Sequence, residues 1–212
     1  MSLTLSFLVP TAGRMSLEYC LASIAYQLQP GDEVLVIGDK TDGPLPQIQQ
    51  LVDSFDDTRL RYLPAPSTQH SWGHRELNYG IRQARGDWLS FNDDDDIWTP
   101  GAADSIRAAA ETAAGRPLLL RFMTYHGYVA WTNRAYFAET HVGGHCIVCP
   151  NVPDKLGVWT DRYQGDWDFI KETVDLHGGE ANIIWREEII ALARPTPDVL
   201  QQVLVQAGRT PA

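Results

Sequence analysis

Residues 84–98, ARGDWLSFNDDDDIW, decide the fold. The pair Arg85-Gly86 is typical of the end of a helix, and the apolar run at residues 87–91 predicts a short buried strand. This strand leads directly into the four aspartates Asp93–Asp96. In open α/β sheets ligands bind beyond the carboxyl ends of the strands, so we expect the functional site at this position.

Strands and helices alternate along the first half of the chain, which is the pattern of a parallel sheet with crossover helices. Apolar residues recur at helical spacing within residues 17–28 and 48–55, and a third helix is expected at residues 75–84. The predicted strands are residues 3–9, 33–38, 59–63 and 87–91.

The second half is less regular. Helices are expected at residues 100–114 and 166–177. Extended segments are expected at residues 117–123 and 125–131, and a short strand at residues 145–149. Residues 181–193 predict either a hairpin or a bent strand. Because two prolines at 195 and 197 follow, we divide the chain into one domain at residues 1–195 and a short C-terminal helix or tail at residues 196–212.

The composition, with 44% hydrophobic and 21% charged residues among 212, is that of one ordinary globular domain. No apolar stretch reaches the roughly 20 residues that span a bilayer, and we expect no signal peptide. Cys20, Cys146 and Cys149 cannot all pair with one another, so a reducing cytoplasm is the expected location. The net charge of -10 disfavours non-specific binding to nucleic acids.

Four consecutive aspartates are unfavourable at the end of a buried strand, because neighbouring negative charges raise each other's pKa unless a cation or solvent compensates them. A hard divalent metal ion is one compensation, and a solvated acidic turn before the helix at residues 100–114 is the other. An EF-hand is excluded, since Ile97 and Trp98 stand where that loop needs an oxygen ligand and a glycine. The chain also has no G-x-G-x-x-G motif and no Walker lysine that would bind phosphates in another way.

Four segments together resemble the large inverting glycosyltransferase family of GT-A fold, the family-2-like nucleotide-sugar glycosyltransferases. They are SFLVPTAGR (6–14), EVLVIGDKTDG (33–43), GHRELNYGIRQARGDWLSFNDDDDIW (73–98) and GDWDFI (165–170). The resemblance extends to about Arg194. It implies an α/β fold, the GT-A or nucleotide-diphospho-sugar transferase fold, with a mostly parallel central sheet and helices on both faces.

The resemblance also assigns residues to the nucleotide sugar. These are Pro10, Thr11, Gly13, Arg14, Asp39, Arg75, Asn78, Asp93 and Asp94. The second strand of the family ends in an acidic pair followed by G-S-T-D, whereas here only Asp39 is a good equivalent, so the base that the chain prefers stays open. A solvated helix face explains Arg75 and Asn78 nearly as well.

The metal site is implied by the D-x-D motif of the family, which aligns with Asp93 and Asp95. Asp95 is the expected ligand of Mn²⁺ or Mg²⁺, Asp93 contacts the ribose or the metal, and Asp96 serves the local turn. A metal at this point neutralises the charge that grows on the leaving diphosphate and so lowers the barrier to transfer.

The catalytic base of inverting members is a carboxylate that opens a late helix, and GDWDFI occupies that place. Asp166 is therefore the expected base and Asp168 the substitute. A positioned carboxylate contributes on the order of 100- to 10,000-fold. The competing interpretation is that Asp166 caps the helix.

Several groups keep two interpretations. His141, His145, Cys146 and Cys149 form a zinc site or, with Gly143-Gly144, a loop close to the donor sugar beside core cysteines. Trp72, Gly73 and His74 precede a helix whose N-terminus can face the diphosphate. Tyr125, His126, Tyr128 and Trp131 line an acceptor groove or pack in the core.

The function expected from the resemblance is metal-dependent, inverting transfer of a sugar from a uridine-diphosphate donor to an acceptor hydroxyl. The acceptor stays open between a small molecule, a glycan, a protein and a modified nucleobase. A sugar-1-phosphate nucleotidyltransferase is an alternative, although it needs a turn rich in glycine and lysine where PTAGR stands. A catalytically inactive relative that binds a nucleotide or glycan is the other.

Overall fold

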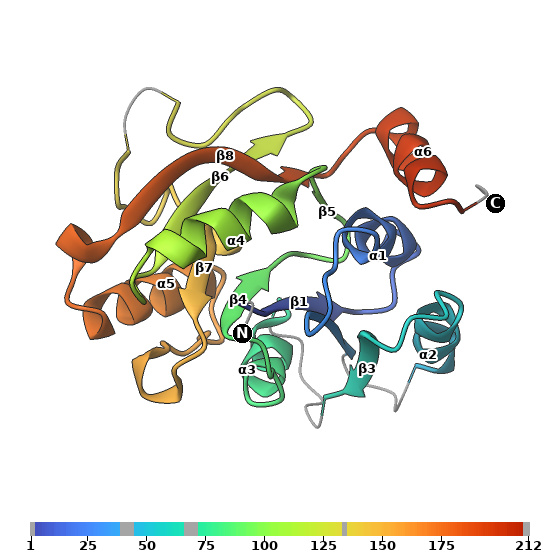
Figure 1. Ribbon diagram of the computed structural model, residues 1–212, viewed down its shortest axis with the longest axis horizontal. Helices are drawn as coiled ribbons and strands as arrows, with labels where there is room; N and C mark the ends of the chain where they lie inside the picture. Colours follow the sequence, from blue (N-terminus) through green and yellow to red (C-terminus); the bar gives the residue numbers. More distant parts are fainter. Residues whose placement is uncertain (1–2, 39–44, 66–71, 133–134, 210–212) are drawn as a thin grey trace.

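The computed structural model describes residues 3–38, 45–65, 72–132 and 135–209. Within these residues eight strands form one mixed sheet. In spatial order they are β3 (Leu60–Pro64), β2 (Glu33–Gly38), β1 (Leu5–Thr11), β4 (Trp88–Phe91), β7 (Ile147–Pro150), β6 (Leu118–Thr124), β8 (Ile184–Ala193) and β5 (Ile97–Trp98) (Figure 1). No helix in the described part of the chain could span a bilayer.

The first four strands of this order are parallel, with Leu8 of β1 opposite Leu35 of β2 and Phe91 of β4. Successive side chains of β1 enter opposite layers, because a strand alternates its faces. Phe7 packs with helices α1 (Leu17–Ala25), α2 (Pro46–Asp53) and α4 (Ala102–Thr112), whereas Leu8 packs with α3 (His74–Ile81) and α5 (Gly165–Leu176). The expected parallel arrangement with helices on both faces is confirmed.

The other half of the sheet is mixed. Strand β7 is antiparallel to β4 and to β6, and β8 is parallel to β6 with register shifts around Arg121. Residues 184–193 are therefore one irregular strand and not a hairpin. Residues 125–131 are wrong as an extended segment, since they form turns with a single bridge between Met123 and Val129. Three short 3-10 turns, η1 (Gly144–Cys146), η2 (Pro153–Lys155) and η3 (Glu180–Asn182), complete this half.

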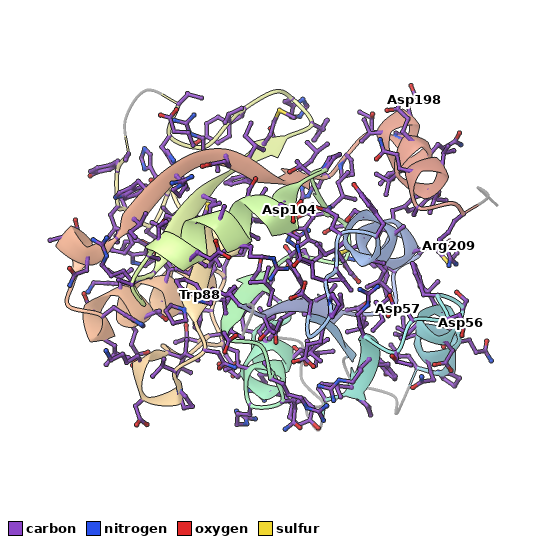
Figure 2. The ribbon with its side chains drawn as sticks, in the orientation of Figure 1. Asp56, Asp57, Trp88, Asp104, Asp198 and Arg209 are labelled. Atoms are coloured by element: carbon purple, nitrogen blue, oxygen red, sulfur yellow. The ribbon has the colours of Figure 1, made fainter. Side chains whose placement is uncertain are left out.

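The last helix, α6 (Pro197–Gln206), packs on the N-terminal half. Val203 and Leu204 are buried against Ala22 of α1. Arg209, after the helix, pairs with Glu18 at 3.0 Å and lies 3.9 Å from the centre of the Phe55 ring. Figure 2 shows Arg209 beside α1 and α2. The end of the described chain is thus a docked helix and not a frayed tail.

Two acids at the start of β2 tie the amino ends of the strands together. The Asp32 carboxylate accepts the backbone N–H of Leu5 at 2.9 Å and pairs with Arg107 of α4 at 2.7 Å. Glu33 accepts hydrogen bonds from the Ser6 hydroxyl at 2.8 Å and the Arg85 backbone N–H at 2.6 Å. Because both acids are buried and paired, this end of the sheet is fixed, while the opposite end stays open for a ligand.

Candidate active site

A cavity of about 720 Å³ opens at the carboxyl ends of β1 and β4. This is the end of the sheet at which parallel strands usually bind ligands. The walls include the turn after β1, the start of α3, the acidic loop after β4, η1, the start of α5 with the segment before it, and Arg194 after β8. Pro10, Thr11, Arg14, Asp93, Asp94, Asp95 and Asp166 are the predicted residues that line it.

The inner part of the acidic loop faces Arg14. The Asp94 carboxylate is almost fully buried and accepts the Thr11 hydroxyl at 2.6 Å and the Arg14 guanidinium at 2.9 Å. Arg14 also pairs with Asp95 at 3.2 Å. Burial raises the pKa of Asp94, while the Thr11 hydrogen bond and the Arg14 charge oppose the rise. Asp94 and Arg14 therefore join the end of β1 to the end of β4.

The outer part of the loop meets His145. Ligand atoms of Asp93, Asp96 and His145 all lie within 4.8 Å of one another. The His145 Nε2 atom is hydrogen-bonded to Asp96 and lies 3.9 Å from Asp93, and the backbone N–H of Arg194 donates to Asp96 at 2.7 Å. We call these three side chains the Asp-Asp-His group.

The charges of the Asp-Asp-His group are coupled. Desolvation in the cavity and the charge of Asp96 raise the pKa of Asp93 to about 6, although the charge of His145 opposes the rise. Burial alone lowers the pKa of His145, but the hydrogen bond and charge of Asp96 outweigh it and raise the value to about 9. The imidazolium therefore compensates the carboxylates at neutral pH.

The two predicted bases have different surroundings. Asp166 lies in the first turn of α5 and lines the cavity; its Oδ1 accepts the backbone N–H of Trp167 at 2.8 Å, and burial raises its pKa. Asp168 pairs with Arg162 at 2.5 Å and accepts the Thr160 hydroxyl. The Arg162 hydrogen bond lowers the pKa of Asp168 to about 2. A proton acceptor directed into the cavity is thus provided by Asp166.

Two predicted nucleotide residues on α3 hold a wall of the cavity. Arg75 pairs with Asp161, and the Asn78 amide bonds both the N–H and the carbonyl of Trp159, at 3.1 and 2.7 Å. Both contacts tie α3 to the segment before α5. Gly13 lies in the turn after β1 and faces Leu45, and Asp39 is outside the described residues.

The predicted zinc group does not assemble around the cysteines. Cys146 and Cys149 are fully buried in the core, and burial raises the pKa of both thiols. His141 contacts the ring of Tyr136. Only His145 of the four reaches an acidic cluster, because η1 turns it toward Asp96.

The predicted aromatic groove is also divided. Trp131 is buried and packs edge-on against Trp185 with 5.2 Å between ring centres, whereas Tyr125 and Tyr128 are exposed. The exposed aromatics at the cavity are instead Trp72 and Tyr163, whose rings lie 6.2 Å apart.

The glycine pair before His145 predicted a loop close to the donor sugar, and His145 does line the cavity, but its contact with Asp96 was not predicted. Sequence reasoning also missed other cavity residues, among them Tyr163 and Arg194. No local signal marks Arg194, which reaches the cavity because β8 ends beside the acidic loop.

Residues 6–115, more than half of the chain, match the model of glycosyl transferase family 2. No curated protein matches the sequence. Among solved structures the chain is similar to TarS 1–349 of S. aureus, with a TM-score of 0.73 and 16% identity over 97% of this chain and 64% of that one.

TarS 1–349 in complex with UDP and with UDP-GlcNAc gives TM-scores of 0.69 and 0.67, at 17% and 16% identity. Each match covers 97% of this chain and 64% or 65% of the other, so the chain spans less than two thirds of these structures. The likeness shows a shared GT-A fold. By the match of its first half, with the acidic strand end that the family carries, this chain belongs to glycosyl transferase family 2.

Proposed function

We propose that the chain is a metal-dependent inverting glycosyltransferase that moves a sugar from a uridine-diphosphate donor to an acceptor hydroxyl. One observation carries the proposal: a single cavity at the carboxyl ends of β1 and β4 is lined by Asp93 and His145 of the Asp-Asp-His group and by Asp166. Such a transfer needs a site that binds the diphosphate with its metal ion, and a general base.

The donor atoms fit a divalent cation. Two carboxylates and an imidazole within 4.8 Å suit Mn²⁺, and Asp93, Asp96 and His145 are the residues that would hold it, with His145 giving up its extra proton when the cation binds. When bound, the cation supplies positive charge that offsets the charge growing on the leaving diphosphate. The D-x-D motif predicts Asp95 as the metal ligand. Because the Asp95 carboxylate is already paired with Arg14, we keep it as the alternative ligand to the Asp-Asp-His group.

Asp166 acts as the general base. Its carboxylate takes the proton of the acceptor hydroxyl while that oxygen attacks the anomeric carbon from the face opposite the diphosphate. The new carbon–oxygen bond forms as the bond to the diphosphate breaks, so the configuration inverts. The diphosphate leaves with the electron pair, and Asp166 returns its proton to water after product release. Its raised pKa makes it a stronger proton acceptor than an ordinary carboxylate.

The uridine assignment is supported by the solved neighbours, since TarS 1–349 binds UDP and UDP-GlcNAc. In this chain the cavity that would take the donor is walled by the turn after β1, with Pro10 and Thr11, and by the acidic loop after β4. The acceptor hydroxyl belongs beside Asp166.

The test is a melting experiment with UDP, GDP and ADP, each with and without Mn²⁺. A ligand that binds only the folded state at 100 times its Kd stabilises it by about 2.7 kcal/mol, which raises Tm by roughly 5–11 °C for a chain of this size. We expect this rise for UDP with Mn²⁺ and little for UDP alone. An equal rise without metal would overturn the metal requirement, and no rise with any nucleotide would overturn the function.

A further inference from the structure

His74, the first residue of α3, is a buried side chain with one hydrogen-bonding atom left open. It is only 5% exposed, yet it lines the cavity. Its Nδ1 lies 2.7 Å from the carbonyl oxygen of Thr160. A carbonyl can only accept, so Nδ1 carries the hydrogen, and Nε2 of the neutral ring is an acceptor. No described group is found bonded to Nε2, and this atom is not among the fully buried polar atoms without a partner, in keeping with the place of His74 in the cavity wall.

The ring is held on several sides. A Cβ on Gly165 would come within 2.5 Å of His74 Nδ1, so only glycine allows the start of α5 to pack so closely on the ring. The Trp159 ring lies 5.6 Å away on a tilted plane, and Asn78 fixes the Trp159 backbone. Because Nδ1 is bound to Thr160, the ring cannot turn without losing that bond, and Nε2 is the atom presented to the cavity.

His74 lies between the turn after β1 and the start of α5, and this position indicates which part of a nucleotide sugar it contacts. On one side, a Cβ on Gly73 would lie 2.7 Å from Pro10, at the turn expected to contact the base. On the other side stands the start of α5 with Asp166. In a nucleotide sugar the sugar lies at the end remote from the base, beside the attacking hydroxyl. His74 therefore stands where the donor sugar is bound.

We propose that His74 Nε2 accepts a hydrogen bond from a hydroxyl of the donor sugar and so selects the sugar, not the nucleotide. The proposal rests on the proposed function. The acceptor character of Nε2 matters, because a neutral nitrogen with a lone pair repels phosphate oxygens but receives an O–H. A site that bonds a hydroxyl also discriminates against donors that lack it, since its acceptor is then left unpaired.

Two matched variants separate the two ring nitrogens. His74→Asn places an amide N–H near Nδ1, which keeps the bond to Thr160 and removes the group at Nε2. His74→Gln places its amide near Nε2 and gives up the Thr160 bond. Calorimetry with Mn²⁺ measures Kd for UDP and for UDP-glucose, UDP-galactose and UDP-GlcNAc. The quantity compared is the ratio of the Kd for UDP to that for the hexose donor that the unmodified protein binds most tightly.

In His74→Asn we expect this ratio to fall about tenfold, the effect of one lost hydrogen bond, with the Kd for UDP changed by less than about twofold. In His74→Gln most of the ratio should remain. If the melting curve shows that His74→Asn does not fold, the His74→Gln variant decides alone. A fall of the Kd ratio to about one in His74→Gln would then contradict the proposal.

A ratio unchanged in His74→Asn overturns the proposal, as does an equal loss of UDP and hexose-donor binding. A ratio of one in the unmodified protein also overturns it, because the sugar then contributes no binding. Failure of the unmodified protein to bind UDP with Mn²⁺ is a different result, since it removes the proposed function itself.

Discussion

The two halves of the sheet are built differently. Strands β3, β2, β1 and β4 are parallel, in continuous register and covered by helices on both faces (Figure 1). Strands β7, β6 and β8 change direction and register, and the segments beside them are joined by side-chain pairs such as Arg162–Asp168 and Arg75–Asp161. The first half thus positions the part of the cavity proposed to bind the nucleotide by backbone pairing, and the second positions the part that holds the proposed base by contacts between side chains.

The largest effect is expected from Asp166, because the general base proposed for the chemical step lies in the second half. Asp166→Asn should lower turnover by about 100- to 10,000-fold and leave UDP binding nearly unchanged, since we propose that the first half binds the nucleotide. Release of UDP from the donor, with and without acceptor, measures turnover, and calorimetry measures binding.

The matched control is Asp168→Asn, two residues along the same helix. Asp168 faces Arg162, so its loss should change turnover by only a few-fold. If both variants lose turnover equally, the division between the two aspartates is wrong.

A smaller effect is expected from changes in the acidic loop, which lies where the two halves of the sheet meet. Asp93→Asn should weaken the Mn²⁺-dependent part of UDP binding by on the order of 10- to 100-fold, because Asp93 belongs to the Asp-Asp-His group. Asp95→Asn should weaken it less, since its carboxylate is paired with Arg14. Titration of Mn²⁺ at fixed UDP measures both, and the reverse order would favour the metal ligand predicted from the D-x-D motif.

The smallest effect concerns stability of the second half. The pKa of Asp168 is lowered to about 2 by Arg162, below the usual value of about 3.9. Its contribution is therefore present above pH 4 and is lost as the pH falls toward 2. Because the pair is partly exposed, Asp168→Asn should cost about 0.5–1 kcal/mol of unfolding free energy at pH 7.

Urea unfolding at pH 7 and at pH 3 measures this difference. The gap between the unmodified chain and Asp168→Asn should be narrower at pH 3, because the carboxylate of the unmodified chain is then partly protonated in the unfolded state. A gap that widens at pH 3 would contradict the assignment of the lowered pKa.

The first half follows from local sequence. Apolar runs and helical spacing placed its strands and helices, and the observed bounds differ from the expected ones by a few residues, as at β1 (Leu5–Thr11). The side chains on one face of these strands, such as Phe7, pack with α1, α2 and α4, which directly follow or precede them in the chain, so the local pattern carries most of the information. The segment at residues 125–131 was wrong as a strand because its alternating aromatics form turns against β6.

The sequence by itself determined that four aspartates follow a buried strand and that two more open a late helix. Tertiary structure decided which of them act together, because adjacent carboxylates point in different directions. Asp96 meets His145, 49 positions away, and the Arg194 backbone, 98 positions away. Such contacts depend on how β7 pairs with β4 and how β8 pairs with β5, which follows the acidic loop, and local spacing carries no record of that packing.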